Sequence, residues 1–272
     1  MKKLIVVADW VADSLTCQEF RTAVEGFVQN PDKLVISYVA STPRTIHTGF
    51  LINQIVEIEE RFGHPLQTVI FQNTDPRLAS HEREIEAKGA PFFIIRLKSG
   101  IILCGPNAGY DFSFIKSRIE EVFVYPGLDK GTQFRSRDLY ARVCSHLMDE
   151  LIDELNLEET SIGLIPTIKG FYIGHIDNFG NIKTTITKEN LKGRYEFGDE
   201  LLVKINKVQK KVKYVASLFG GRVGQPVIYP GSSGERDNPY LEISVWRHFD
   251  QEDWVTGSKL FQDPLPGTAI EI

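Results

Sequence analysis

The chain has little cysteine and little methionine, with three cysteines and two methionines among 272 residues. Cys17, Cys104 and Cys144 are odd in number and widely spaced. A disulfide framework needs paired cysteines, and a zinc site needs closely spaced ligands, so neither is expected. We therefore predict no metal site and a reducing, cytoplasmic setting.

Charge of one sign and long apolar runs are also scarce. Lysine plus arginine number 31 against 36 aspartate plus glutamate, a net charge of −5 without a long run of either sign. This excludes the basic footprint of a nucleic-acid-binding protein. No apolar run approaches the roughly 18 residues of a membrane span. The first apolar run reaches Asp9 too soon for the core of a signal peptide. We expect a soluble protein with neither nucleic acid nor membrane as partner.

The hydrophobic content of 42% is enough for one large core or two unequal domains. Apolar runs predict strands, and helical periodicity predicts helices, in an alternating order typical of α/β folds. The expected strands span 4–8, 34–39, 68–73, 91–96, 100–103 and 122–125, and the expected helices 15–27, 45–62 and 139–155. Short strands separated by turn residues then follow, at 203–205, 212–214, 227–229 and 241–245. We predict an α/β domain over residues 1–162, with a mostly parallel sheet flanked by helices, and a smaller all-β, barrel-like domain over 163–272.

Polar residues follow the first predicted strand. The run LIVVA ends at Asp9, as a buried parallel strand with a functional carboxylate at its edge does. Ser14 is expected to cap the next helix, and Asp13 and Ser14 would then lie at a helix N-terminus that favours an anionic ligand group. The alternative is that Asp9 is only a strand-end turn residue and Ser14 only a cap.

The most informative stretch is the polar corner DNFGN at 177–181, between two β-type runs. Gly180 permits backbone angles that other residues resist, so Asp177, Phe179 and Asn181 can present a carboxylate, an aromatic face and an amide together. That set suits a purine ligand bearing a cation. The alternative is a hairpin in which the Asp and Asn only hold their own turn.

A second turn-rich stretch, PGSSG at 230–234, is expected to be a flexible loop. The N–H and hydroxyl donors of Ser232 and Ser233 would suit a ligand carboxylate. A plain surface loop is the alternative.

The segment IDNFGNIKTTI, residues 176–186, resembles the C-terminal signature of the S-adenosylmethionine (SAM) hydroxide adenosyltransferases, relatives of the SAM-dependent fluorinase and chlorinase. Thr185 replaces the late Asn of that signature. The resemblance spans nearly the whole chain in order. It implies that Asp177 holds the methionyl amino group, and that Phe179 and Asn181 contact adenine. It also implies an α/β domain plus a β-barrel, assembled as a homotrimer with the ligand between subunits.

For the N-terminal half, the resemblance implies that Asp9 binds the ribose diol, and Asp13 with Ser14 the methionyl end. Val11 stands where the family has glycine. Asp75 and Arg83 would position the attacking water, with Arg77 as the competitor for the arginine.

The segment TQFRSRD at 132–138 resembles the family motif that introduces a helix. Phe134 and Ser136 are retained, and a serine there is the choice of the halogenating enzymes. Arg135 stands where the hydrolases have a histidine. An arginine is permanently cationic and cannot act as a general base near neutral pH, although it can attract hydroxide or another anion. Asn107 stands where the family has an aspartate. The resemblance implies that Asn107 and Phe134 contact the substrate and that Arg135 and Ser136 belong to the catalytic set.

The resemblance implies hydrolysis of SAM to adenosine and L-methionine by attack of water or hydroxide at C5′. SAM would be the substrate, and no other cofactor is expected. Two alternatives remain open. One is a halide, chloride-type adenosyltransferase of the same fold, and the other is a non-catalytic protein that binds adenosine or SAM.

Overall fold

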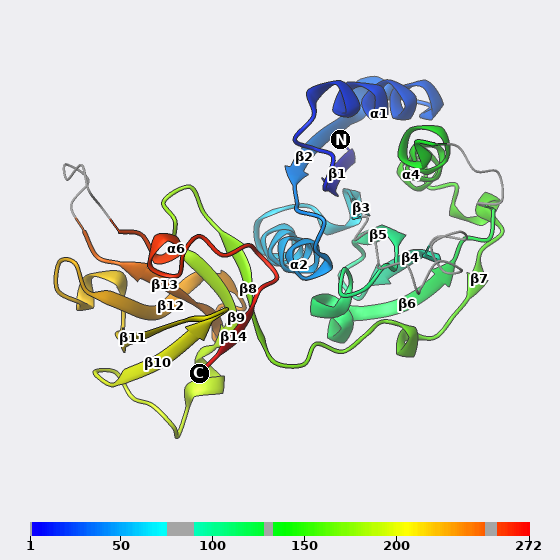
Figure 1. Cartoon of the computed structure of the whole chain (residues 1–272). Helices are drawn as coiled ribbons and strands as arrows, with labels where there is room; N and C mark the ends of the chain where they lie inside the picture. Colours follow the sequence, from blue (N-terminus) through cyan, green and yellow to red (C-terminus); the bar gives the residue numbers. More distant parts are fainter. Residues whose placement is uncertain (1, 75–89, 128–132, 248–254) are drawn as a thin grey trace. The chain divides into compact units, whose positions relative to one another are not determined.

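The computed structural model describes residues 2–74, 90–127, 133–247 and 255–272. The chain divides into two compact units, Met1–Ile168 and Lys169–Ile272. Both units contain a mixed sheet with helices (Figure 1). None of the helices within the described ranges is both long enough and apolar enough to cross a lipid bilayer.

The sheet of the first unit has the strand order β2-β1-β3-β5-β4-β6-β7. Its strands are β1 (Lys2–Ala8), β2 (Leu34–Ala40), β3 (Thr68–Asn73), β4 (Phe92–Leu97), β5 (Ile102–Pro106), β6 (Ile119–Val124) and β7 (Glu158–Glu159). Pairing is parallel from β2 through β1 and β3 to β5, and antiparallel from β5 through β4 and β6 to β7. The two predicted strands on either side of the glycine-containing turn at 98–100 form an antiparallel hairpin of β4 and β5. The expectation of a mostly parallel sheet is wrong, because this hairpin reverses the chain direction.

Two apolar cores cover the two faces of this sheet. Alternate residues of β1 supply both cores, since successive side chains of a strand point to opposite faces. Leu4 and Val6 face the helices α1 (Ser14–Phe27) and α4 (Ala141–Met148). Ile5 and Val7 face α2 (Thr45–Phe62). The carboxyl ends of β1, β3 and β5 therefore meet at one edge of the sheet, between the two helical layers (Figure 1).

The helix predicted over 139–155 is shorter than expected. A π-helical turn, η5 (Ser136–Tyr140), leads into α4, which ends at Met148. Glu150 then takes a positive φ of 62°, a conformation that ends a right-handed helix. A short 3₁₀ turn, η6 (Ile152–Leu155), follows and carries Leu155, the last apolar residue of the predicted pattern.

The second unit contains β8 (Phe171–Ile176), β9 (Ile182–Thr187), β10 (Glu200–Ile205), β11 (Val208–Tyr214), β12 (Pro226–Gly234), β13 (Pro239–Val245) and β14 (Ala269–Glu271), with the short helices α5 (Lys188–Leu191) and α6 (Gly257–Leu260). The strand order is β10-β11-β12-β13-β9-β8-β14, and β14 also pairs with β10, so the order closes on itself. The β11–β12 pairing is parallel. Alternate residues of the strands, such as Leu201 and Val203, fill a single apolar core.

Candidate functional site

The corner at 177–181 is a tight turn that joins β8 to β9 and is held by Asp177. One carboxylate oxygen, Oδ1, accepts the backbone N–H groups of Phe179 and Asn181, each at 2.9 Å. The other, Oδ2, accepts the side-chain amide of Asn181 at 2.9 Å. Gly180 adopts a φ of +75°, as this turn requires. Asp177 and Asn181 therefore hold their own turn, as the alternative prediction stated. The same hydrogen bonds fix the direction of both side chains.

Residues distant in the sequence support the corner. The Ser244 hydroxyl, on β13, donates to Oδ1 of Asn181 at 2.5 Å. The backbone N–H of Ser258, on α6, donates to the carbonyl of Gly180 at 2.8 Å. A Cβ at Gly180 would lie 2.5 Å from Oγ1 of Thr256, so the position has no room for a side chain. The side chain of Phe179 remains 57% exposed above this rigid turn.

The stretch expected to be a flexible loop at 230–234 is instead the end of β12. Ser232 donates its backbone N–H and its hydroxyl to Oε1 of Glu242, at 2.9 and 3.2 Å. Lys183 donates to the same Oε1 at 2.7 Å and to the Ser232 hydroxyl at 3.0 Å. Ser233 is buried. The donors predicted at Ser232 for a ligand carboxylate are therefore already bound to a carboxylate of the chain itself.

Glu242 is a buried residue, 5% exposed, at the centre of this cluster. The phenol of Tyr229 donates to its second oxygen, Oε2, at 3.3 Å. Burial, together with the neighbouring Glu242 charge, raises the pKa of Tyr229 above its ordinary value. Burial lowers the pKa of His175, with the Lys183 ammonium adding to the effect, so this imidazole is neutral at pH 7. Sequence reasoning missed Lys183 and Glu242; the signal was a charged residue inside each of two apolar strands.

In the first unit, Asp9 directly follows β1, and its backbone N–H donates to the carbonyl of Asn73 at the end of β3, at 3.3 Å. The side-chain amide of Asn73 donates to the Ser136 hydroxyl at 2.5 Å. Ser136 is 1% exposed. Asn73 therefore links Asp9 and Ser136 at the carboxyl edge of the sheet.

Asp13, and not Ser14, caps α1, so that prediction was wrong. The Asp13 carboxylate accepts the backbone N–H groups of Leu15 and Thr16 at 3.2 and 3.3 Å, and the Thr16 hydroxyl at 2.5 Å. The Thr16 hydroxyl and the Leu15 N–H lower the pKa of Asp13. An ionised carboxylate at this position also interacts favourably with the helix dipole, which a serine hydroxyl does not. Ser14 is the first residue of the helix and is exposed.

Phe134 and Arg135 introduce the helical segment that starts at Ser136. The Phe134 ring packs edge-on against Trp10, with the ring centres 6.0 Å apart. Burial raises the pKa of Tyr140, and the charge and hydrogen bond of Arg135 oppose that shift. Arg135 thus lies beside Tyr140. Asp75 and Arg83, the predicted water-positioning residues, lie outside the described residues.

Asn107 follows β5 and is bound to other parts of the unit. Its backbone N–H donates to the carbonyl of Pro91 at 2.8 Å, and its side-chain amide donates to the carbonyl of Leu164 at 3.1 Å. Its side-chain oxygen, Oδ1, is buried and has no hydrogen-bond partner among the described residues. The ligand role predicted for Asn107 stays a prediction, as do those of the other candidate residues.

Asp111, in the same loop, was missed by sequence reasoning. It is 0% exposed, and its carboxyl oxygens lie near the backbone N–H groups of Asp111 and Ala108 without a well-aligned hydrogen bond to any described residue. Burial raises its pKa well above the ordinary value, and the Asp9 charge adds to this effect against the backbone N–H groups of Asp111 and Ala108. The available signal was an acidic residue between two aromatics, Tyr110 and Phe112.

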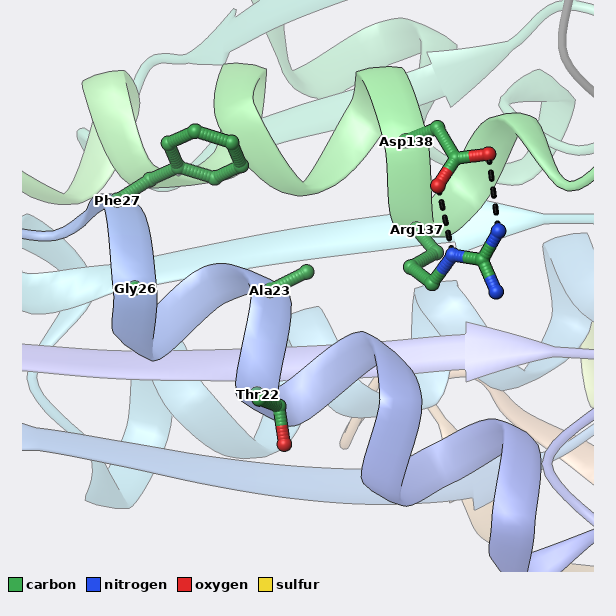
Figure 2. A pocket seen from close by; sticks show the side chains of 6 residues that line it. All are labelled: Thr22, Ala23, Gly26, Phe27, Arg137 and Asp138. Carbon is green, nitrogen blue, oxygen red and sulfur yellow. Dashed lines mark hydrogen bonds and ion pairs between the residues drawn. The ribbon is translucent and has the colours of Figure 1, made fainter.

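A cavity of about 370 Å³ lies between α1 and η5 (Figure 2). It is lined by Thr22, Ala23, Gly26, Phe27, Arg137 and Asp138. The guanidinium of Arg137 binds both carboxylate oxygens of Asp138, at 2.6 and 3.1 Å, and also Glu19 at 3.0 Å. None of the predicted site residues lines this cavity, and its one cation is already neutralised by acidic neighbours.

Comparison with known proteins gives similarities in sequence and in fold. Residues 171–247 match the model of the SAM hydroxide adenosyltransferase C-terminal domain. A curated (R)-S-adenosyl-L-methionine hydrolase from Methanocaldococcus jannaschii is 29% identical over 165 residues, covering 53% of this chain and 54% of the relative. The chain thus aligns with about half the length of that relative.

The fold is also shared with solved structures. An uncharacterized conserved protein from Thermotoga maritima superposes with a TM-score of 0.68 and 16% identity, over 98% of each chain. A conserved hypothetical protein from Thermus thermophilus superposes with a TM-score of 0.64 and 16% identity, over 99% of each chain. At this identity, the likeness concerns the fold alone.

Proposed function

We propose that the chain is a SAM hydroxide adenosyltransferase, as the match over 171–247 and the archaeal relative support, and that it cleaves SAM with water to adenosine and L-methionine. The observation that carries the proposal is the corner at 177–181, which lies inside the matched segment. There a turn fixed by three hydrogen bonds to Asp177 presents the exposed ring of Phe179.

The reaction is a displacement at C5′ of the adenosyl group. The water oxygen attacks C5′ in line with the C5′–S bond, which breaks as its electron pair moves to the sulfonium sulfur. The proton lost by the water goes to solvent, and the products are adenosine and the neutral thioether of methionine. Opposite charges, hydroxide and sulfonium, neutralise each other in the transition state, so a water-poor site that aligns them accelerates the step. Alignment contributes roughly 7–11 kcal/mol in favourable model reactions.

In this proposal Asp9 binds the ribose hydroxyls, and the methionyl end is held by Asp13 with Ser14. The ring of Phe179 and the amide of Asn181 contact adenine. The bond from Ser244 supports this role, because it occupies only the oxygen of the Asn181 amide. The amide nitrogen carries two N–H donors, of which Asp177 accepts one, so the second can reach a ring nitrogen of the purine.

The second oxygen of the Asp177 carboxylate has capacity for a further donor. Oδ1 accepts two N–H groups and Oδ2 accepts one, while each carboxylate oxygen has two lone pairs. A methionyl ammonium group fits that remaining position. We assign Ser232 and Ser233 only a minor part in binding the ligand carboxylate, because the donors of Ser232 are bound to Glu242.

The name of the archaeal relative specifies the (R) epimer at the sulfonium. We extend the proposal to that epimer, which differs from the (S) form only in the configuration of the sulfur. The two epimers direct the methionyl chain differently from the same adenosine. A site that binds adenine and ribose tightly and the methionyl end weakly would accept both epimers.

One specific observation supports the non-catalytic alternative. Arg135 replaces the histidine of the hydrolases and lies beside Tyr140, and the Ser136 hydroxyl is already hydrogen-bonded to Asn73. A protein of this kind would bind adenosine or SAM without turnover. The chloride-type alternative needs an anion near the same segment, where the guanidinium of Arg135 would supply positive charge.

Product analysis tests the proposal. The purified protein is incubated with (S)-SAM or (R)-SAM in water enriched in ¹⁸O, with and without chloride, and the nucleosides are separated and weighed by mass spectrometry. Adenosine labelled at the 5′ oxygen is the expected product. 5′-Chloro-5′-deoxyadenosine would instead select the halide alternative, and calorimetric binding without either product would select the binding protein.

A matched pair of variants connects the reaction to the corner. Phe179→Ala removes an exposed ring that forms no part of the three turn bonds, and it is expected to raise KM by about 5- to 150-fold by loss of adenine stacking, worth about 1–3 kcal/mol. Leu202→Ala removes a comparably exposed side chain elsewhere in the same unit and serves as the control. Equal kinetics for the two variants would remove the corner from the site.

The resemblance further implies a homotrimer with shared sites, in the cytoplasm, and we include both in the proposal. Light scattering after gel filtration gives the assembly mass. Mixing Asp9→Ala with Asp177→Ala subunits should restore part of the activity if a site uses residues of two subunits. No restoration after exchange of subunits would contradict shared sites.

A further inference from the structure

Three strands of the second unit carry polar side chains on the face opposite their apolar core. The strands are β13, β9 and β8, which are neighbours in the sheet (Figure 1). Ile182 pairs with Ile176 on β8 and with Ile243 on β13, and all three pack in the core. Successive side chains of a strand point to opposite faces, so the residues next to these isoleucines share the other face. These residues are His175, Asp177, Asn181, Lys183, Glu242 and Ser244.

The polar corner therefore lies on the same face as Lys183. Ser244, on β13, donates to Asn181 at 2.5 Å. Glu242, two residues earlier on the same strand, accepts from Lys183 at 2.7 Å. Asn181 is bound to the Asp177 carboxylate at 2.9 Å, and two residues of a strand span roughly 6.5 Å. The Lys183 ammonium is therefore within reach of a small molecule bound at Asp177.

The Lys183 ammonium is accessible and has a donor to spare. It donates to Oε1 of Glu242 at 2.7 Å and to the Ser232 hydroxyl at 3.0 Å. A lysine ammonium carries three N–H donors, so within the described chain one remains for a further acceptor. The Lys183 side chain is 16% exposed, and Ser232 beside it is exposed. A ligand can therefore reach this ammonium from solvent.

Glu242 holds the ammonium in one place. Its carboxylate is buried and also accepts donors from Ser232 and Tyr229, so it cannot follow a moving lysine. A cation fixed in advance loses little side-chain entropy when a ligand binds. Arg247, another cation at this corner, donates to the carbonyl of Phe179 at 3.2 Å and is only 8% exposed. Lys183 is the more accessible of these two cations.

Asp177 and Lys183 present opposite charges along one face. The end of an α-amino acid carries opposite charges too, on an ammonium and a carboxylate attached to one carbon. Oδ2 of Asp177 accepts one hydrogen bond and has capacity for another. One charge-assisted hydrogen bond of about 2.8 Å at each end lets such a group bridge the two side chains. A ligand with an ammonium alone would leave the third donor of Lys183 unused.

We propose that Lys183 is a ligand-contacting residue, whose ammonium binds the α-carboxylate of the methionyl end while Asp177 binds its ammonium group. The inference rests on the proposed function, because it takes an adenosyl amino acid as the occupant. It adds a specificity determinant: the site selects adenosyl ligands with a complete amino acid end over those that lack the carboxylate.

Calorimetry with two unreactive ligands tests the assignment on the full-length protein. S-adenosyl-L-homocysteine carries the amino acid end on a thioether, and 5′-deoxy-5′-(3-aminopropylthio)adenosine differs from it only by lacking the carboxylate. Neither ligand is a sulfonium, so neither has the leaving group of the proposed reaction. Lys183→Gln should weaken binding of the homocysteine ligand by about 10- to 150-fold, the loss of one hydrogen bond to a charged group. The affinity for the amine should stay within about threefold of the wild type.

Two further variants separate ligand binding from support of the fold. Lys204→Gln removes an exposed ammonium bound to Glu271 in the same unit and should change neither affinity. Lys183→Gln/Glu242→Gln removes both charges of the buried pair, so no buried charge is left uncompensated. The double variant should show the same loss for the homocysteine ligand as Lys183→Gln. It also takes the place of the single variant if Lys183→Gln does not fold.

The outcomes distinguish this inference from the proposed function. Equal weakening of both ligands in Lys183→Gln, or a restored preference for the homocysteine ligand in the double variant, would mean that Lys183 only holds Glu242 and would overturn the inference. A wild type that cleaves SAM, with an unchanged ratio of the two affinities in Lys183→Gln, would overturn the inference alone. A wild type that binds neither ligand and does not bind SAM would overturn both proposals.

Discussion

Replacing Lys183 with methionine should destabilise the second unit far more than an ordinary surface mutation. The Lys183 ammonium and the Glu242 carboxylate lie 2.7 Å apart, and their side chains are only 16% and 7% exposed. Removing one partner of a buried ion pair leaves the other charge uncompensated, which typically costs 3–5 kcal/mol. In Lys183→Met, Glu242 would keep the donors from Ser232 and Tyr229. We therefore expect the lower end of that range, about 3 kcal/mol.

The pair Lys204–Glu271 provides a matched control within the same unit. Its atoms lie 2.9 Å apart, but the side chains are 42% and 71% exposed. Exposed pairs contribute about 0–1 kcal/mol, because water screens both charges and the long side chains lose entropy. Lys204→Met should therefore change the free energy of unfolding by less than 1 kcal/mol.

The assay is urea unfolding followed by circular dichroism and calorimetry, on the single variants and on the double variant Lys183→Met/Glu242→Leu. The double variant removes both charges, so it should recover most of the loss and give a coupling free energy of at least about 2 kcal/mol. It should also release the N–H and hydroxyl of Ser232. The reasoning is refuted if Lys183→Met costs no more than Lys204→Met, or if the double variant is as unstable as the sum of the single ones.

Three further changes test the local geometry. Gly180→Ala should lower the free energy of unfolding in urea by about 1 kcal/mol or more beyond the loss caused by Gly193→Ala. Both glycines have a φ of +75°, but a Cβ at Gly180 would clash with Thr256, whereas nothing lies within 4 Å of a Cβ at Gly193. Equal losses would exclude the steric effect. The folded chain holds the proton of Asp111 at pH values where the unfolded chain has lost it, because the folded pKa is raised. The contribution of Asp111 to the free energy of unfolding is therefore largest below the unfolded pKa of 3.8. Above that pH it falls, by up to about 1.4 kcal/mol per pH unit, until the folded pKa is passed. Scanning calorimetry should therefore show the Tm advantage of Asp111→Asn over the wild type growing from pH 4 to pH 7, and a constant difference would contradict the protonated state. Asp13→Ala should lower Tm at pH 7 and Ser14→Ala should not, and because the folded pKa of Asp13 is lowered, the difference between them should vanish as the pH falls through that pKa.

Local patterns in the sequence predicted those features whose causes are local. The apolar run of β1 is buried on both faces, and its composition alone predicts this. The turn at 177–181 follows from a glycine with an Asp and an Asn on either side of it. The β4–β5 hairpin follows from two apolar runs around a Gly-containing turn.

The features that sequence reasoning missed depend on contacts between distant residues. The stretch PGSSG has the composition of a loop, but cross-strand pairing with β13 and the buried Glu242 make it part of β12. The bond from Ser244 to Asn181 joins residues 63 positions apart. The burial of Asp111 depends on the approach of α2, which no pattern around Asp111 encodes.

The close fit of α2 against the loop after β5 has a consequence for engineering this part of the chain. Gly49 and Gly109 leave no space between helix and loop, so a change in one segment requires a matching change in the other. Grafting the loop alone from a relative, or lengthening it, would force the helix away from the sheet. Exchanges in this region should therefore replace residues 45–49 and 107–111 together.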